Sequence, residues 1–293
     1  MQGTAPNQVT LGNASYGYRE YGLREFFEAS KSAGVTAVEI DCGWLEESRN
    51  NIAVEATPED VAAVRHLAEE VGVTVVALGG GAVVGLEGEV AQDRCEEMMK
   101  TIAVADALDA RVIRVFTEHD FTHSKHYVLP AERVTDALYE TLAAAFERLG
   151  RYAEEKGVAL AIENHGGTSA TGAGLRRLLD MVPSPAVGVT YDPANYAYGG
   201  EDPYAALQAV LERVQYTHWK DVAAPDGKVE YRAFGEGDID WQPIIRTLLD
   251  EFHGIWAIEY ERKVDSTLET LVEGTSLSID NLTAAIEQAR QAQ

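Results

Sequence analysis

Residues 57–78 read TPEDVAAVRHLAEEVGVTVVAL and contain one complete helix followed by one strand. Thr57 is a typical N-cap residue, Pro58 suits the first helical position, and two acidic residues follow in the first turn. Gly72 stands where a left-handed residue would end the helix. The run Thr74–Leu78 is almost continuously apolar and β-branched, which is typical of a parallel strand covered on both faces. This stretch therefore predicts a surface helix and then a buried strand.

The same alternation continues along the whole chain. The predicted strands are Val9–Gly12, Ala37–Asp41, Thr74–Leu78, Arg111–Thr117, Ala159–Glu163, Val187–Tyr191, Val214–His218 and Ile255–Tyr260. The predicted helices are Leu23–Ala33, Pro58–Val71, Glu89–Leu108, Ala131–Lys156, Leu175–Met181, Pro203–Arg213, Trp241–Phe252 and Ser266–Arg290. Eight such units without a Pro/Gly/Ser-rich linker favour an α/β fold, a single (β/α)8 TIM-barrel domain over residues 1–293. We interpret Gly79-Gly80-Gly81 as a tight turn at the barrel mouth.

The amino-acid composition argues against nucleic-acid and membrane partners. The chain has 48 acidic and 24 basic residues and a formal net charge of -24, and no basic stripe is present. Nucleic-acid binding needs clustered cations that displace counterions from phosphates, so a nucleic-acid partner is disfavoured. The first residues carry neither a basic start nor an apolar run, and no segment approaches 18 uninterrupted apolar residues. We therefore expect a cytoplasmic protein without a membrane partner.

Polar residues at the ends of the last four predicted strands indicate a site. Glu163, Asp192, His218 and Glu259 each stand at or next to the C-terminal end of a strand, where barrels build their active sites. A buried acid is costly unless it is paired or bound to a cation. Three oxygens and one nitrogen suit Mn²⁺, Co²⁺ or Mg²⁺ and can admit Fe²⁺ or Zn²⁺. Alternatively, the glutamates are structural salt-bridge partners at the barrel rim.

Five motifs carry or adjoin these residues. They are Ile162-Glu163-Asn164-His165-Gly166-Gly167, Tyr191-Asp192-Pro193-Ala194-Asn195, His218-Trp219-Lys220-Asp221, Gly235-Glu236-Gly237-Asp238-Ile239-Asp240 and Glu259-Tyr260-Glu261. Together they resemble the xylose-isomerase-like TIM-barrel superfamily, and within it the sugar phosphate isomerase/epimerase group. The resemblance covers nearly the whole chain but specifies no substrate. It implies that Glu163, Asp192, His218 and Glu259 bind one divalent metal, that Glu163 and Glu259 also transfer protons, and that the protein is a dimer or a tetramer.

The chemistry of such a reaction explains the need for two glutamates. Isomerising or epimerising a ketose removes a proton next to a carbonyl and returns it elsewhere, and a divalent metal stabilises the resulting enediolate. One carboxylate takes the proton and the other gives it back. We therefore predict a divalent-metal-dependent isomerase or epimerase of a sugar or sugar derivative, with Mn²⁺ as the preferred metal. The alternative is a metal-dependent lyase or dehydratase that acts on an inosose or keto-glycoside.

Further candidates for binding the carbohydrate substrate flank these positions. They are His119, His165, Asn195, Lys220 and Glu236. His165 and Lys220 each lie two residues beyond a predicted ligand, and Glu236 lies between two glycines that would permit close approach. Lys220 could equally form a salt bridge with a neighbouring acid.

A function of a different class is also possible, because the apurinic-site endonucleases share the superfamily fold. Those enzymes bind several metals through additional histidines, one of them three residues after the aspartate that matches Asp192. Asn195 stands at that position here, and residues 226–237 contain no histidine. With too few ligands and no cationic surface, this function is disfavoured. A non-catalytic binding protein is a further alternative.

Overall fold

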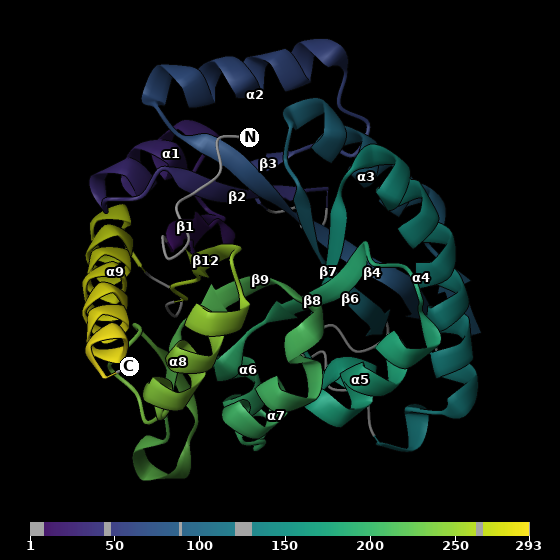
Figure 1. Cartoon of the computed structure of the whole chain (residues 1–293). Helices are drawn as coiled ribbons and strands as arrows, with labels where there is room; N and C mark the ends of the chain where they lie inside the picture. The colour runs from purple at the N-terminus through teal and green to yellow at the C-terminus, as the bar shows by residue number, and fades with distance from the viewer. Residues whose placement is uncertain (1–8, 44–47, 88–89, 121–130, 262–265, 293) are drawn as a thin grey trace.

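Helices and strands alternate around a central barrel in the computed structural model, which describes residues 9–43, 48–87, 90–120, 131–261 and 266–292 (Figure 1). The barrel strands are β1 (Thr10–Ala14), β2 (Ala37–Cys42), β4 (Thr74–Glu87), β6 (Val112–Asp120), β7 (Ala159–Glu163), β8 (Val187–Tyr191), β9 (Val214–Trp219) and β12 (Ile255–Ile258). Each pairs in parallel with its neighbours in this order, and β1 pairs with β12 to close the ring. The predicted (β/α)8 TIM barrel is confirmed.

The helices cover the outside of this ring (Figure 1). They are α1 (Leu23–Ser32), α2 (Pro58–Val71), α3 (Cys95–Leu108), α4 (Asp136–Lys156), α5 (Gly172–Met181), α6 (Pro193–Tyr198), α7 (Pro203–Val210), α8 (Trp241–Glu251) and α9 (Leu268–Gln291). Residues such as Phe27 in α1 and Phe146 in α4 are fully buried in the main hydrophobic core. Within the described ranges, no helix is both long and apolar enough to cross a membrane.

Local signals account for the accurate bounds of α2. The Thr57 side chain accepts a hydrogen bond from the backbone N–H of Asp60, and the Asp60 carboxylate accepts one from the backbone N–H of Thr57. This reciprocal capping box satisfies two helix-end donors. Gly72 has φ +85°, the left-handed conformation predicted for the residue that ends the helix.

Several segments differ from the predictions. The helix predicted from Glu89 is wrong in its first turn, because Val90–Asp93 forms β5, antiparallel to β4. The Asp93 carboxylate accepts a hydrogen bond from the backbone N–H of Cys95, the first residue of α3. The segment that joins β8 to α7 contains the unpredicted α6, with Asp192 as its N-cap. A small hairpin of β10 (Asp221–Ala223) and β11 (Glu230–Arg232) follows β9.

The glycine run at residues 79–81 is not a turn, contrary to the prediction. It lies inside β4, where Gly79 is in register with Asp41 of β2 on one side and Arg114 of β6 on the other. A Cβ atom on Gly79 would lie 2.6 Å from Asp41 Oδ1 and 2.7 Å from Arg114 Nη2. The missing side chain therefore leaves room for charged groups to meet across β4.

A second, smaller apolar cluster consists of Ala77, Ala161, Tyr216 and Ala257. The last three lie two residues before Glu163, His218 and Glu259, and the period of two in a strand places each pair on the same face. These residues form a layer on the inner face of the barrel, next to the polar ends of the strands.

Candidate metal centre

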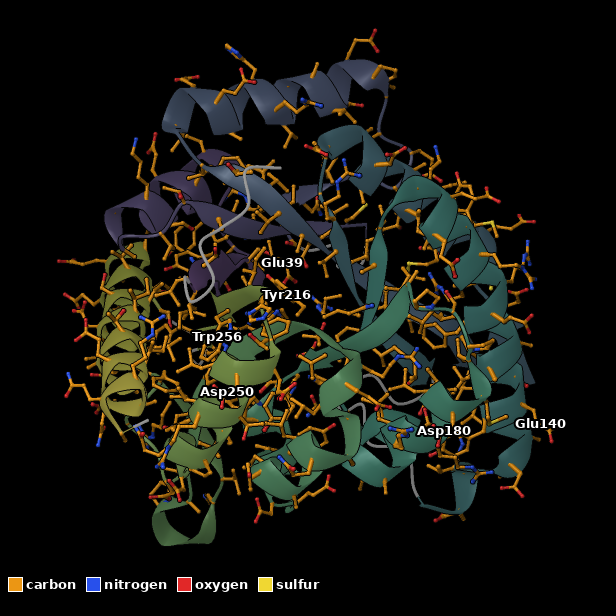
Figure 2. The ribbon with its side chains drawn as sticks, in the orientation of Figure 1. Glu39, Glu140, Asp180, Tyr216, Asp250 and Trp256 are labelled. Atoms are coloured by element: carbon orange, nitrogen blue, oxygen red, sulfur yellow. The ribbon has the colours of Figure 1, made fainter. Side chains whose placement is uncertain are left out.

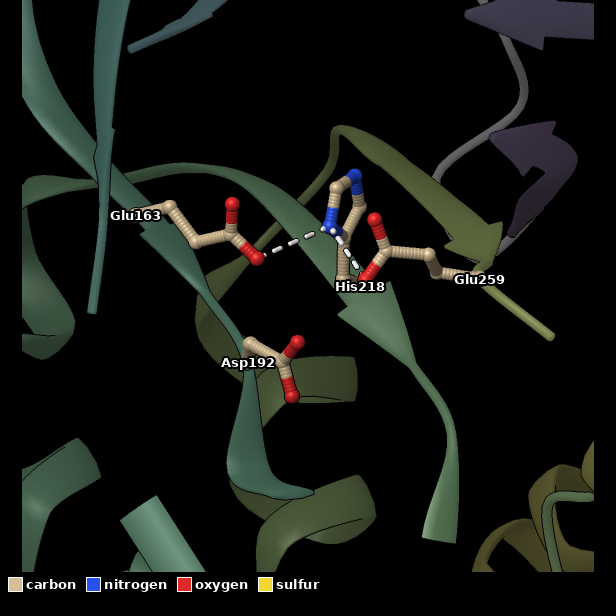
Figure 3. Close-up of side chains that lie close together, drawn as sticks. All are labelled: Glu163, Asp192, His218 and Glu259. Carbon is tan, nitrogen blue, oxygen red and sulfur yellow. Dashed lines mark hydrogen bonds and ion pairs between the residues drawn. The ribbon is translucent and has the colours of Figure 1, made fainter. Parts of the chain in front are cut away.

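Four polar side chains from consecutive barrel strands meet at one point (Figure 3). Glu163 is the last residue of β7, Asp192 follows β8, His218 lies in β9, and Glu259 follows β12. One ligand atom from each lies within 4.8 Å of the others, and all four side chains are buried. The structure thus brings together the four residues that the sequence assigned to one centre.

The histidine lies between the two glutamates. Its Nδ1 atom is 3.3 Å from Glu163 Oε1 and 3.3 Å from Glu259 Oε2, as the dashed lines in Figure 3 mark. The end of β12 is fixed against β9 because the backbone N–H of Glu259 donates a hydrogen bond to the Trp219 carbonyl. Both glutamates therefore present a carboxylate oxygen to the same imidazole nitrogen.

Asn164 fixes the neighbouring strand ends. Its side-chain amide donates a hydrogen bond of 2.8 Å to the Asp192 carbonyl and accepts one of 2.9 Å from the backbone N–H of Asp192. This pair of bonds joins the end of β7 to the end of β8 and fixes the spacing between Glu163 and Asp192.

Charge partners determine how the glutamates titrate. Burial and the charge of Glu259 act to raise the pKa of Glu163, but His218 and Arg114 outweigh them and lower it to about 2. Burial also opposes ionisation of Glu259, yet the cations of His218 and Lys220 hold its pKa well below the usual range. Both glutamates are therefore ionised at neutral pH, the state in which a carboxylate binds metal.

The donor set fits a divalent cation. Three carboxylates supply oxygens and His218 supplies a ring nitrogen, all close enough to share one ion. Oxygen-rich shells with one imidazole suit Mn²⁺, Mg²⁺ or Co²⁺ and do not distinguish between them.

Lys220 lies in the same cluster and is itself buried. Its Nζ atom is 2.8 Å from Asp192 Oδ2 and 2.7 Å from Glu261 Oε1, and it also pairs with Glu259. Burial and the charge of Glu259 raise the pKa of Glu261 to about 7, although Lys220 acts to lower it. The salt bridge that the sequence left open for Lys220 is therefore present, and substrate binding by this residue stays a prediction.

Asn195 contacts two of the four residues. Its side-chain amide donates to Glu163 Oε1 at 3.2 Å, and its backbone N–H donates to Asp192 Oδ1 at 3.1 Å. The Asn195 Oδ1 atom accepts a hydrogen bond of 2.8 Å from the hydroxyl of Tyr231. Asn195 therefore orients Glu163, and its contact with substrate stays a prediction.

The remaining substrate-binding candidates occupy different surroundings. His165 is partly buried and packs edge-on against Phe116, with ring centroids 5.2 Å apart. Glu236 is exposed in the loop after β11, and the adjacent Gly237 packs closely against Asp221. His119 lies in β6, but its side chain is outside the described part of the structure.

Two charged residues in mid-strand were not predicted as part of the site. Glu39 Oε2 lies 2.8 Å from His218 Nε2, and Arg114 Nε lies 3.5 Å from Glu163 Oε2. Figure 2 shows Glu39 toward the middle of the barrel, whereas Glu140 and Asp180 lie on the outer helices. Glu39 and Asp41 lie two residues apart in the otherwise apolar strand β2, so both face the same side. Two acids on one face of a buried strand could have indicated from the sequence that this strand contributes to the site.

Comparisons with known proteins agree with this architecture. The family model described as "Xylose isomerase-like TIM barrel" matches residues 27–287. A Clostridium perfringens protein named inosose dehydratase is 30% identical in an alignment 155 residues long, which covers 46% of this chain and 50% of that protein. The chain thus spans about half the length of the curated relatives it matches.

Two solved structures share the fold at low sequence identity. A D-tagatose 3-epimerase-like protein superposes with a TM-score of 0.72 at 17% identity, covering 97% of this chain and 99% of that one. Mannonate dehydratase from Streptococcus suis serotype 2 superposes with a TM-score of 0.68 at 17% identity, covering 97% and 96%. The closed barrel and the family match over most of its length establish that the chain belongs to the xylose isomerase-like TIM-barrel family.

Proposed function

We propose that the protein is a metal-dependent isomerase or epimerase that moves a proton next to the carbonyl group of a sugar or sugar derivative. The observation that carries this proposal is the buried cluster of Glu163, Asp192, His218 and Glu259, whose ligand atoms lie within 4.8 Å of one another. A divalent cation bound there would supply Lewis-acid stabilisation of the negative charge that develops on the substrate oxygens.

The remaining roles in the proposed reaction fall to side chains of the protein. Asp192 and His218 would hold the cation together with the two glutamates, and Glu163 and Glu259 face the centre from separate strands. In the proposed reaction, one glutamate takes the proton from the carbon and the other returns it. Asn195 holds Glu163 by a hydrogen bond, and Lys220 holds Glu259 by an ion pair. Fixed carboxylates suit this reaction because each must already lie beside the carbon that loses or gains the proton.

A dehydratase that acts on an inosose is the second candidate, and the curated sequence relatives support it. The first step is again removal of a proton next to the carbonyl by a glutamate. The hydroxyl on the neighbouring carbon then accepts a proton and leaves as water, and a carbon–carbon double bond forms. The same centre serves both reactions, which differ in the fate of this hydroxyl.

A solvent-exchange experiment tests the proposal and separates the two candidates. The protein is incubated with Mn²⁺ and a panel of ketoses and keto-inositols in D₂O, and the products are analysed by NMR and mass spectrometry. Deuterium at a substrate carbon without loss of water supports an isomerase or epimerase. A product that has lost water supports the dehydratase. Absence of both reactions across the panel would contradict metal-dependent proton transfer.

We expect Mn²⁺ to raise the melting temperature of chelator-treated protein and the His218→Gln substitution to remove most of this rise. A ligand at about 100 times its Kd stabilises a protein by about 2.7 kcal/mol, which shifts the melting temperature by several degrees. His218→Gln removes the nitrogen ligand. His253→Gln, at an exposed histidine between α8 and β12, is the matched control and should keep the full rise. Equal rises in both variants would exclude His218 as a ligand.

A further inference from the structure

We infer that Glu39 is a positioning residue that holds the His218 ring so that Nδ1, and not Nε2, faces the metal centre. This inference rests on the proposed function. Glu39 lies in β2 and His218 in β9, 179 residues apart in sequence, and both are almost completely inaccessible to solvent. Glu39 Oε2 is 2.8 Å from Nε2, whereas Nδ1 is 3.3 Å from an oxygen of each catalytic glutamate.

The two ring nitrogens of a histidine have separate roles in such an arrangement. A carboxylate that accepts the proton of one nitrogen leaves the lone pair of the other nitrogen for the metal, and it also makes that nitrogen a better donor. Glu39 stands on the far side of the ring from Glu163 and Glu259, so it fixes both the ring orientation and the ligating atom.

The second oxygen of Glu39 has its own partner. Glu39 Oε1 lies 3.4 Å from Arg114 Nε, and the Arg114 side chain is only 3% exposed. Arg114 comes from β6 and reaches β2 across β4, where Gly79 leaves the path open. Arg114 therefore engages Oε1 and leaves Oε2 free to accept a hydrogen bond from His218.

This geometry explains why glutamine would not replace Glu39. Both oxygens of Glu39 face groups that only donate hydrogen bonds once His218 binds metal through Nδ1. A glutamine has one oxygen and one NH₂ group. In either orientation, the NH₂ group faces the Nε2 proton or the Arg114 guanidinium, and one contact becomes repulsive.

The test is the Mn²⁺ affinity of Glu39→Gln, measured by isothermal titration calorimetry on the full chain. We expect Mn²⁺ binding to weaken by about 10–100-fold, the usual effect of losing such a supporting group. Glu118→Gln is the matched control, because Glu118 is also buried and accepts hydrogen bonds from the backbone N–H and the hydroxyl of Thr168. This control replaces another buried carboxyl group by an amide and should keep wild-type affinity.

A measurement on the wild-type protein does not depend on whether the variant folds. In the Zn²⁺-loaded protein labelled with ¹⁵N-histidine, the His218 signals should show a proton on Nε2 and a metal-bound Nδ1. The opposite assignment would overturn the inference, as would wild-type Mn²⁺ affinity in Glu39→Gln, and in both cases the proposed function would stand. Failure of the wild-type protein to bind either metal would overturn the proposed function together with the inference.

Discussion

Glu163→Gln is expected to lower Mn²⁺-dependent proton exchange between substrate and solvent by about 10²–10⁴-fold, the usual contribution of a general acid or base. Glutamine has nearly the same shape as glutamate but cannot accept the proton. The amide oxygen can still accept the hydrogen bond that Asn195 donates to Glu163 Oε1, so this contact should persist, while the NH₂ group replaces Oε2 opposite Arg114 Nε. Exchange rates are measured by NMR in D₂O at saturating Mn²⁺, so that weaker metal binding does not enter the comparison.

Two comparisons make this result specific to Glu163. Glu118→Gln removes a buried glutamate whose hydrogen bonds go to Thr168, and it should exchange at the wild-type rate. Glu259→Gln should be impaired to a similar degree, because the proposed reaction needs one glutamate to take the proton and the other to return it. A Glu163→Gln variant that exchanges at the wild-type rate would remove Glu163 from the proton-transfer role.

Gly79→Val is expected to lower the free energy of unfolding by about 3–5 kcal/mol, the usual cost of breaking a buried ion pair. Even the first added carbon would lie 2.6 Å from Asp41 Oδ1 and 2.7 Å from Arg114 Nη2. Arg114 would lose its path to Glu39 and Asp41, and buried charges would remain without partners. The measurement is urea unfolding followed by circular dichroism.

The control for Gly79 is a glycine with space around it. Gly199 lies at the exposed C-terminal end of α6, and a Cβ atom there would meet its nearest neighbours at 3.4 Å, an ordinary contact distance. Gly199→Val should therefore change the free energy of unfolding by about 0.5 kcal/mol or less. Similar unfolding midpoints for both variants would show that Gly79 does not serve the Arg114 contacts.

Local chemistry explains which parts of the fold were predictable. The helix Pro58–Val71 and the strands Ala159–Glu163 and Val187–Tyr191 have the predicted bounds. Capping residues and continuous apolar runs mark these elements within a few residues of chain. The strand β5 and the glycine run in β4 were misjudged because both depend on tertiary neighbours. Gly79 is required by Asp41 and Arg114, which lie on other strands.

The candidate site also contains some residues that the sequence could predict and others that it could not. Glu163, Asp192, His218 and Glu259 were predictable as a group because the ends of parallel barrel strands meet on one face. The contact between Glu39 and His218 could not be predicted from the sequence, because the strands that carry these residues are not neighbours in the barrel. The glycines beside Glu236 suggested a close approach to the site, but Gly237 packs against Asp221.

The central claim is that Glu163, Asp192, His218 and Glu259 bind one divalent cation. A crystal structure of the protein with Mn²⁺, with an anomalous difference map recorded near the manganese absorption edge, tests it most directly. The expected result is a single strong peak bonded to His218 Nδ1 and to oxygens of Glu163, Asp192 and Glu259. A map without a peak among these residues, with Lys220 still paired to Asp192 and Glu259, would contradict the claim.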